Sequence, residues 1–406
     1  MKINTIRQKI TPPIGTHLAG YGQNVISDGI HDDLCISGLC FDDGQKQAIL
    51  LSYDLLGLDA DLVQIIRAEC SNVARIQPEH IVLACTHTHS GPHTRSLAIR
   101  SKDEDYSEKL VEYSKEAVAN AFDDMTTVSI YRYSAECYEN INRRVITPDN
   151  TCIYLPHNKH LTPIAKGITD TELGILYFLE EKTQKPVATM VNYAAHPLTC
   201  QSDGSSSLKI TSDYPGVLRR VVEDEIGGMC IFTTGACGDL HPKDFETGFG
   251  RTREMGNAMA RIVIDSFSDA RRNEDRYMMI VPQLDVRTGT VDMRFRKSGC
   301  IEGRLPLYEG MDKETFEFQL LRIGDACLVG VPGELLAEPG LEIKWNSPFR
   351  KTFILYNSTA YLSYIPHVNA YISGGYESET SHIEPFSAFK LVSRIVDEFQ
   401  KFDNII

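Results

Sequence analysis

The chain has 406 residues, a formal net charge of −14 and 42% hydrophobic residues, a composition typical of a soluble globular protein. The acidic balance and the lack of a long basic stretch disfavour nucleic acid and anionic membranes as partners. The sequence holds no run of about 18 apolar residues, so a membrane-spanning helix and membrane association are not expected.

The N-terminal segment and the cysteines both favour a cytoplasmic location. Residues 1–7 lack the apolar core of a secretory signal. The eleven cysteines include no Cys-x-x-Cys pair, which argues against a thiolate zinc site. Most of them have apolar neighbours, so we interpret them as reduced core thiols in a reducing compartment.

Strand and helix patterns alternate along the whole chain. Apolar runs predict strands at 48–52, 81–85, 127–133, 173–178, 187–193, 229–234, 278–286, 316–323, 326–331 and 353–356. Helical periodicity predicts helices at 59–73, 107–122, 212–225, 251–267 and 385–402. This order favours an α/β fold, with mixed β-sheets flanked by helices, in a single large domain over residues 1–406. Residues 147–170 have weak periodicity and are predicted to form a long loop, a candidate lid.

The most informative motif follows the predicted strand at 81–85. There the chain reads Cys85-Thr86-His87-Thr88-His89-Ser90-Gly91-Pro92. On an extended backbone, residues two apart point to the same side, so His87 and His89 are expected to present two imidazoles together. Neutral imidazole is the commonest nitrogen ligand of protein-bound metals. The motif therefore indicates part of a metal site.

Two further polar residues follow predicted strands. His196 comes just after the strand at 187–193, and Glu334 follows Val331-Pro332-Gly333. Taken singly, such a histidine is more often a hydrogen-bonded structural residue, and such a glutamate is favoured by a helix dipole. With the pair at 87 and 89, however, they supply the ligand types of a zinc site.

Two other segments leave their alternatives open. Asp239 and His241 again stand two residues apart after a strand, where a structural turn and a metal-binding role are equally compatible. Tyr364, Tyr371 and Tyr376 lie in a segment where tyrosines usually pack and form hydrogen bonds. A metal can nevertheless bind a phenolate and lower its pKa. A second metal held by Asp239, His241 and His89 also stays open at this point.

Taken in order, these segments resemble the neutral/alkaline non-lysosomal ceramidase family, over most of the chain. The tyrosine spacing is the most discriminating part: Tyr364, Tyr371 and Tyr376, with Glu377 following, keep the family's intervals. The other matching residues are Ile10-Thr11-Pro12, Gly20-Tyr21-Gly22, Gly29-Ile30-His31, Asp54, Thr86 to Pro92, Asn142-Arg143, Asn192, His196-Pro197, Ser212-Asp213, Gly238-Asp239 and Pro332-Gly333-Glu334.

The resemblance implies a zinc ion and a set of residues around it. The implied zinc ligands are His87, His196, Glu334 and Tyr364. Such a set leaves room for a water or a substrate oxygen, as in a catalytic rather than a structural zinc site. The implied polar residues facing the scissile amide are His89, Arg143 and Tyr376.

The chain departs from the family pattern at two points. Where the family carries the serine usually assigned as nucleophile, this sequence reads Gly238-Asp239-Leu240-His241-Pro242, so His241 takes the serine position. The family also continues into a C-terminal immunoglobulin-like domain, which we do not expect here because the sequence stops at Ile406.

The sequence therefore predicts a zinc-dependent hydrolase that uses metal-activated water instead of a serine. We expect it to cleave the C–N bond of a small soluble N-acyl or lactam-type amide, with His241 or His89 as general base. Arg143 and Tyr376 are expected to stabilise the oxyanion or to anchor the substrate. Two alternatives stay open: a hydrolase of a sugar-derived, lactone or ester substrate, and a non-catalytic zinc-containing binding protein.

Overall fold

The computed structural model describes residues 1–21, 25–96, 101–154, 165–200, 208–244, 248–279, 283–297, 308 and 310–402. Its largest element is a mixed sheet in the strand order β14-β12-β11-β6-β1-β3-β4-β5. These strands are β1 (Lys2–Lys9), β3 (Cys35–Asp42), β4 (Gln47–Tyr53), β5 (Ile81–Cys85), β6 (Thr126–Glu136), β11 (Glu172–Glu180), β12 (Pro186–Tyr193) and β14 (Met229–Thr234). The pairs β4–β5 and β12–β14 are parallel, and the others are antiparallel.

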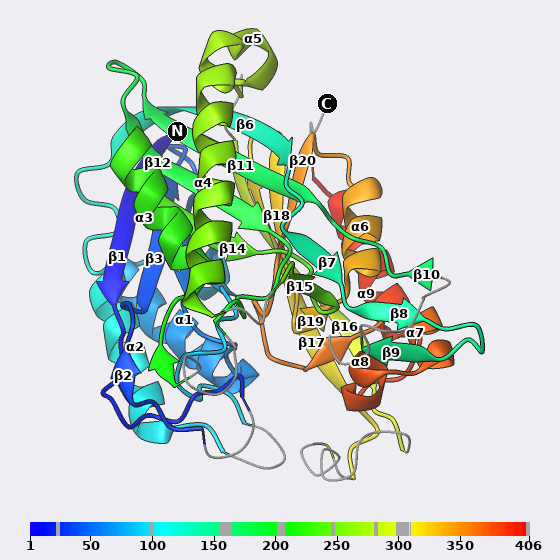
Figure 1. Cartoon of the computed structure of the whole chain (residues 1–406). Helices are drawn as coiled ribbons and strands as arrows, with labels where there is room; N and C mark the ends of the chain where they lie inside the picture. The colour runs from blue at the N-terminus through cyan, green and yellow to red at the C-terminus, as the bar shows by residue number, and fades with distance from the viewer. Residues whose placement is uncertain are drawn as a thin grey trace.

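Four helices cover one face of this sheet. They are α1 (Ala60–Ala74), α2 (Glu104–Val118), α3 (Tyr214–Ile226) and α4 (Phe249–Arg272). Figure 1 shows α3 and α4 side by side across the green strands, and these two helices contact each other and strands β14 and β6. Alternate residues of β4 explain the layering: Ile49 and Leu51 face α1 and α2, whereas Ala48 and Leu50 pack on the opposite side.

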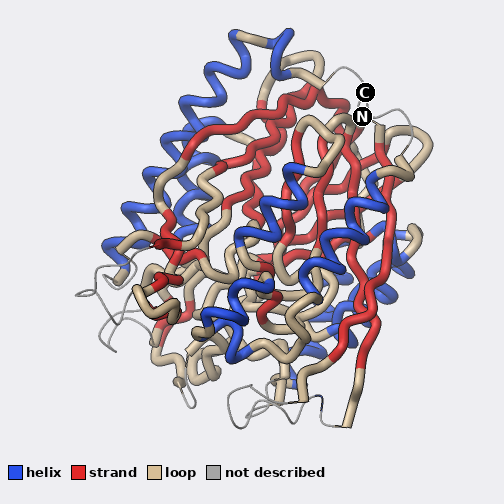
Figure 2. The backbone as a smooth tube through the Cα atoms, turned by 90° about the vertical axis from the view of Figure 1, so that its right-hand side faces the viewer, coloured by secondary structure: helices blue, strands red, loops and turns tan. Residues whose placement is uncertain are grey.

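A second sheet packs on that opposite face. It has the order β16-β17-β18-β20, formed by β16 (Leu284–Arg294), β17 (Lys313–Ile323), β18 (Ala326–Gly330) and β20 (Lys351–Leu355). Leu328 and Phe353 share a core with Phe178 and Met190 of the large sheet. The far face is covered by α6 (Ala337–Trp345) and α9 (Ser387–Phe399). The layers are therefore helix, sheet, sheet and helix, and Figure 2 shows the stacked strands between helices.

Short elements complete the structure. They are β2 (Gly29–Ile30), the 3₁₀ turn η1 (Pro78–His80), β7 (Asn140–Asn142), β8 (Arg144–Ile146), β9 (Cys152–Tyr154), β10 (Ala165–Lys166), β13 (Lys209–Ile210), β15 (Leu240–Pro242), α5 (Glu274–Tyr277), β19 (Glu334–Leu335), β21 (Tyr364–Ile365), α7 (Val368–Ser373) and α8 (Tyr376–Thr380). Among the described residues, no helix has both the length and the apolar character needed to cross a membrane.

The large sheet is folded so that its two ends meet. Its halves are joined by a short strand pairing, in which Lys2 and Ile3 of β1 pair with β6. The edge strand β14 therefore lies against β3, β4 and β5. The hydroxyl of Thr234, at the end of β14, donates to the carbonyl oxygen of Thr86 at 2.6 Å. The amide of Tyr356 donates to the carbonyl oxygen of Thr234 at 3.0 Å, which brings the end of β20 to the same place.

The predicted α/β fold with mixed sheets and flanking helices is confirmed. Asp213 caps α3, since its carboxylate accepts a hydrogen bond from the amide of Tyr214 at 2.7 Å. The strand predicted at 278–286 is wrong in position, because the strand there begins at Leu284 and continues to Arg294. Within the predicted loop at 147–170, β9 and β10 form short pairs with β8, and residues 155–164 of the candidate lid lie outside the described residues.

Candidate metal centre

The histidine pair lies in a turn beyond the end of β5. The strand ends at Cys85, and His87 has a left-handed backbone with φ of 70°. Strand alternation is therefore not what brings the two imidazoles together. The turn does so instead, and it places the ring centres of His87 and His89 5.1 Å apart. The expectation of neighbouring rings holds, although the physical reason for it was wrong.

His196 joins this pair from the other end of the large sheet. Its ring centre lies 4.7 Å from that of His87 and 5.6 Å from that of His89. One ligand atom from each of His87, His89 and His196 lies within 4.8 Å of the others. These three residues form a group that could hold a metal ion, and we call them the histidine group.

The hydrogen bonds of the histidine group indicate which ring nitrogen carries the proton. In each residue Nδ1 faces a backbone carbonyl oxygen: Leu56 at 2.7 Å for His87, Gly20 at 2.9 Å for His89 and Leu240 at 3.0 Å for His196. A carbonyl oxygen only accepts, so Nδ1 of each neutral ring holds the proton and Nε2 presents a lone pair. Nε2 of His89 and of His196 is buried and has no hydrogen-bond partner among the described residues.

Burial favours the neutral form of the two histidines after β5. It lowers the pKa of His87 to about 3, where His196 and Arg95 also act in this direction and Glu334 opposes them. Burial, with His87 and His196, likewise holds the pKa of His89 well below its usual range. Both rings are therefore neutral near pH 7, the state in which imidazole binds metals.

Glu334 adds a carboxylate beside the histidine group. The residue begins β19 and is only 2% exposed. Its Oε2 lies 3.6 Å from Nε2 of His87 and also 3.6 Å from Nε2 of His196. Burial alone would raise the pKa of Glu334, but His87, His196 and Tyr361 hold it well below its usual range. A carboxylate oxygen therefore faces two nitrogen lone pairs.

This donor set fits a cation. Lone pairs on Nε2 and Oε2 repel one another when nothing positive lies between them. Two ligands of one tetrahedral Zn²⁺, each at about 2.1 Å, are about 3.4 Å apart, which is close to the observed 3.6 Å. Nitrogen and carboxylate oxygen are also the ligand types that zinc takes in proteins. His87, His196 and Glu334 thus have both the chemistry and the spacing of metal ligands.

Tyr364 lies next to Glu334 but is bonded to Arg143. The two residues are paired in register on the parallel strands β19 and β21. The hydroxyl of Tyr364 accepts a hydrogen bond from Nη2 of Arg143 at 3.1 Å. Burial raises the pKa of Tyr364, with Glu334 acting in the same direction, so the hydroxyl is protonated in the absence of a cation.

Arg143 is a buried hub with several partners. It donates to Oε1 of Glu377 at 2.6 Å and to the carbonyl oxygen of Gly238 at 2.8 Å, in addition to Tyr364. Its guanidinium carbon lies 5.5 Å from the ring centre of Tyr376, which is 39% exposed. The ring of Tyr376 packs edge-on against Tyr364 with centres 5.6 Å apart. The structure thus brings Arg143, Tyr364 and Tyr376 together.

His241 also lies beside the histidine group. Its ring centre is 5.1 Å from that of His196, and its Nε2 contacts Nη1 of Arg143. Burial holds the pKa of His241 well below its usual range, and Arg143 and His196 add to the effect. The ring is therefore neutral, and its Nε2 accepts the hydrogen bond from Arg143.

Asp239 has a structural position. Its Oδ1 accepts from the amide of Ala337 at 2.8 Å, at the start of α6, and its Oδ2 accepts from the side chain of Asn142 at 2.7 Å. The described group that could hold a metal includes neither Asp239 nor His241. Nothing in this geometry supports the second metal that the sequence left open.

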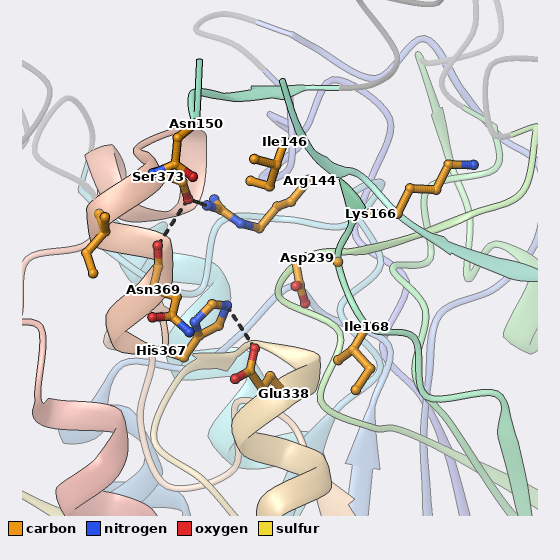
Figure 3. Close-up of a pocket in the computed structure, with 12 residues that line it drawn as sticks. Arg144, Ile146, Asn150, Lys166, Ile168, Asp239, Glu338, His367, Asn369 and Ser373 are labelled. Atoms are coloured by element: carbon orange, nitrogen blue, oxygen red, sulfur yellow. Dashed lines mark hydrogen bonds and ion pairs between the residues drawn. The ribbon is translucent and has the colours of Figure 1, made fainter. Parts of the chain in front are cut away.

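A separate cavity borders the centre at Arg144. Glu377 joins the two, because its Oε1 accepts from Arg143 and its Oε2 accepts from Arg144, both at 2.6 Å. Arg144 lines a cavity of about 590 Å³ together with His367 and Glu338, whose side chains pair in Figure 3. None of the three residues of the histidine group is among the described residues that line it.

Sequence reasoning missed four residues of the centre. The hydroxyl of Tyr356 donates to Oε2 of Glu334 at 2.9 Å, and the hydroxyl of Tyr361 contacts Oε1. Glu377 was noted only as the end of the tyrosine spacing, and Arg95 was not noted. A sequence signal existed for Tyr361, which lies three residues before Tyr364, but the contact with Glu334 depends on the fold.

Three residues around the centre have a left-handed backbone although none is glycine. They are His87 with φ of 70°, Asn357 with φ of 47° and Ser363 with φ of 70°. The side-chain amide of Asn357 lies 3.0 Å from Nδ1 of His87. The carbonyl oxygen of Ser363 accepts from the amide of Glu334 at 2.8 Å. This conformation is uncommon for L-residues, although asparagine and histidine adopt it more often than most.

Comparison with known proteins places the fold. The sequence matches no family model and no curated protein. The structure is similar to a neutral ceramidase from Pseudomonas aeruginosa, with a TM-score of 0.78 and 16% identity over 98% of this chain and 73% of that one. A ceramidase complexed with C2 gives the same TM-score and identity over 98% of this chain and 74% of that one. The chain therefore has the α/β fold of the neutral ceramidases.

Proposed function

We propose that the protein is a zinc-dependent hydrolase that cleaves the C–N bond of a small soluble N-acyl or lactam-type substrate. One observation carries the proposal: three imidazoles whose Nε2 atoms hold lone pairs converge on one another, and two of them, His87 and His196, face a buried carboxylate. The ceramidase-like fold supports amide cleavage as the reaction.

In this proposal His87, His196 and Glu334 hold the metal, and Tyr364 is the fourth ligand. Zn²⁺ would supply Lewis-acid activation of a carbonyl group and of water. The protein holds the two imidazoles in place because their Nδ1–H groups donate hydrogen bonds to the carbonyl oxygens of Leu56 and Leu240. Such backbone contacts fix the ring orientation, as supporting residues commonly do around a metal.

His89 is the residue proposed to accept and return a proton. Its Nε2 is buried without a partner among the described residues, and its Nδ1 is fixed by the carbonyl oxygen of Gly20. The corresponding nitrogen of His241 already accepts from Arg143. A general base needs an available lone pair, so the contacts favour His89 for this role and a positioning role for His241.

Arg143 and Tyr376 are proposed to organise the substrate side of the site. Arg143 ties together Tyr364, His241 and Glu377. Tyr376 is more exposed than Tyr364, the tyrosine it packs against. The side chain of Tyr376 is therefore the one suited to meet an entering substrate. Both then serve to orient the scissile amide and to stabilise the developing negative charge.

The test combines metal content with turnover. The purified full chain is loaded with zinc, the metal is counted by elemental analysis, and a panel of N-acyl amides and lactams is assayed. Wild type should bind one zinc and hydrolyse at least one substrate, whereas His87→Ala and Glu334→Gln should lose both properties. His80→Ala is the matched control, because Nδ1 of His80 contacts the carbonyl oxygen of Gln47 outside the site.

The outcomes separate the alternatives. Mass spectrometry of the products distinguishes C–N from C–O cleavage. His89→Ala should lower kcat by about 100-fold or more while zinc is retained, as expected for a general base. Zinc binding without turnover of any substrate would contradict the proposal and favour a binding protein.

A further inference from the structure

Arg95 lies beside the candidate metal centre, and two of its three guanidinium nitrogens have no hydrogen-bond partner among the described residues. The residue is 7% exposed. Its Nε and Nη1 atoms are buried, and neither forms a hydrogen bond with a residue that the structure describes. Its guanidinium carbon lies 4.0 Å from the ring centre of Tyr361, whose hydroxyl contacts Oε1 of Glu334. A single aromatic ring therefore separates this positive charge from a carboxylate of the centre.

The backbone on both sides of Arg95 is anchored. The hydroxyl of Thr94 donates to the carbonyl oxygen of Gly57 at 2.7 Å, and the amide of Ser96 donates to Oδ2 of Asp59 at 2.8 Å. Gly57 also packs against Tyr361, since a Cβ atom there would lie 2.4 Å from Cδ2 of that ring. Arg95 and the ring beneath it are thus held in place before any ligand binds.

This combination is unusual for a structural arginine. A buried guanidinium normally pairs with a carboxylate or with several carbonyl oxygens, because its desolvation is costly. Stacking on Tyr361 compensates only part of that loss. Arg143, by contrast, is paired with Glu377. Among the described arginines near the centre, Arg95 is therefore the one whose Nε and Nη1 donors have no partner in the structure.

We propose that Arg95 binds a carboxylate of the substrate and so sets the substrate class. The inference rests on the proposed function and narrows it to amides that carry a negative charge, such as N-acyl amino acids or lactams with a carboxylate. A single guanidinium matches one negative charge, and its N–H groups suit a planar carboxylate. In this reading, Arg95 is a specificity residue and the metal ligands act on the amide.

The test compares substrates that differ only in that charge. A panel of N-acetyl amino acids is paired with the N-acetyl amino alcohols of the same side chains, and kcat/KM is measured with the zinc-loaded full chain. Wild type should prefer the carboxylate of its best pair by about 10- to 100-fold. Arg95→Met should remove most of that preference, and Arg95→Lys should restore part of it because the charge returns. Arg350→Gln, at a 73% exposed side chain, should keep the wild-type ratio.

Two results overturn the inference: wild type without a preference for the carboxylate, or Arg95→Met with the preference intact. If no pair is hydrolysed, the same compounds are titrated calorimetrically into the zinc-loaded proteins. Carboxylate-selective binding that Arg95→Met abolishes would support Arg95 while the hydrolase proposal fails. An absence of selective binding would overturn the inference itself. Turnover with equal rates for both members of each pair would leave the hydrolase standing without a role for Arg95.

Discussion

One buried carboxylate balances two buried arginines at the edge of the metal centre. Glu377 is 1% exposed, and its two oxygens bind Arg143 and Arg144 separately. Burial would raise the pKa of Glu377, but the two guanidinium groups hold it below its usual range. Arg143 also contacts Tyr364 and His241. By binding Arg143, Glu377 therefore helps to position Tyr364, the proposed fourth ligand.

Replacing this carboxylate should destabilise the protein strongly. Glu377→Gln keeps the shape but leaves two buried guanidinium charges without compensation, so we expect a loss of about 3 to 5 kcal/mol in the free energy of unfolding. Urea denaturation at pH 7 measures it. Glu379→Gln, an exposed residue in the same helix, should change stability by less than about 0.5 kcal/mol. Equal effects of the two substitutions would show that the shared ion pair is unimportant.

At the scale of single residues, the site could be predicted mainly from polar residues that directly follow a predicted strand. It identified His87, His89, His196 and Glu334, which the structure brings together. It could not identify Arg95, because an arginine in a loop is normally solvated. Arg95 is unusual only because its Nε and Nη1 are buried without a partner among the described residues.

At the scale of elements, a short strand pair fixes the position of Glu334, the proposed carboxylate ligand. β19 and β21 pair over two residues each, and Glu334 lies opposite Tyr364. Gly333 precedes this pair at a point of close approach, since a Cβ atom there would lie 2.7 Å from the carbonyl oxygen of Ser363. That same carbonyl oxygen accepts the hydrogen bond from the amide of Glu334.

Gly333→Ala should therefore weaken metal binding without changing any ligand. The added methyl group must push β19 away from Ser363 and move Glu334 from its place, and we expect at least about a tenfold loss of zinc affinity. Competition with a chromogenic chelator measures the affinity. Gly250→Ala provides the control, because a Cβ atom there meets nothing within 4 Å, and zinc affinity should not change. Unchanged affinity in Gly333→Ala would show that the pair tolerates the shift.

Longer elements were predictable from periodicity, and short ones were not. β5 and β14 were predicted with their observed bounds because each is a continuous apolar run. β19 and β21 were not predicted, because a strand of two residues is too short to show a hydrophobic periodicity. The strand predicted at 278–286 began too early because apolar residues before Leu284 mimic a strand, while the alternating residues up to Arg294 conceal the true one.

At the scale of the whole molecule, ion pairs connect the two sheets. Glu172 begins β11 in the large sheet and binds Lys351 at the start of β20 in the second sheet. It also binds Lys344 of α6 at 3.0 Å. Burial would raise the pKa of Glu172, but the two lysines outweigh it and lower the pKa to about 2.

This connection predicts a stability contribution that depends on pH. The ionised carboxylate stabilises the folded state fully above its unfolded pKa of about 4.3, and the contribution disappears as pH falls towards about 2. Glu172→Gln should therefore lose about 2 kcal/mol at pH 7 and less than half of that at pH 3. Urea denaturation of both proteins at each pH measures the difference. Glu181→Gln, which is exposed, should show little effect at either pH, and a difference that stays constant with pH would contradict the assignment.

The arrangement of sheets and helices in layers could be predicted from the sequence, but the contact between the edge strands β5 and β14 could not. Alternating strand and helix patterns suffice to predict an α/β fold. The order of strands in a sheet, and the narrow β1–β6 junction that lets the sheet fold on itself, depend on long-range packing. The folding of the sheet brings His196 to His87 and His89, and the sequence does not reveal it. The contact between His87 and His89 has a separate cause, the left-handed turn after β5.

The left-handed backbone at His87 implies a trade-off between stability and chemistry. Glycine adopts this conformation without penalty, whereas an L-residue loses about 1 kcal/mol or more. In chelator-treated protein, His87→Gly should therefore be more stable than His87→Ala by about 1 kcal/mol, measured by denaturation. Equal stabilities would show that the turn relaxes. If the difference holds, selection for stability alone would favour glycine at this position, and the imidazole would be lost. Only a requirement for the side chain can then keep histidine there.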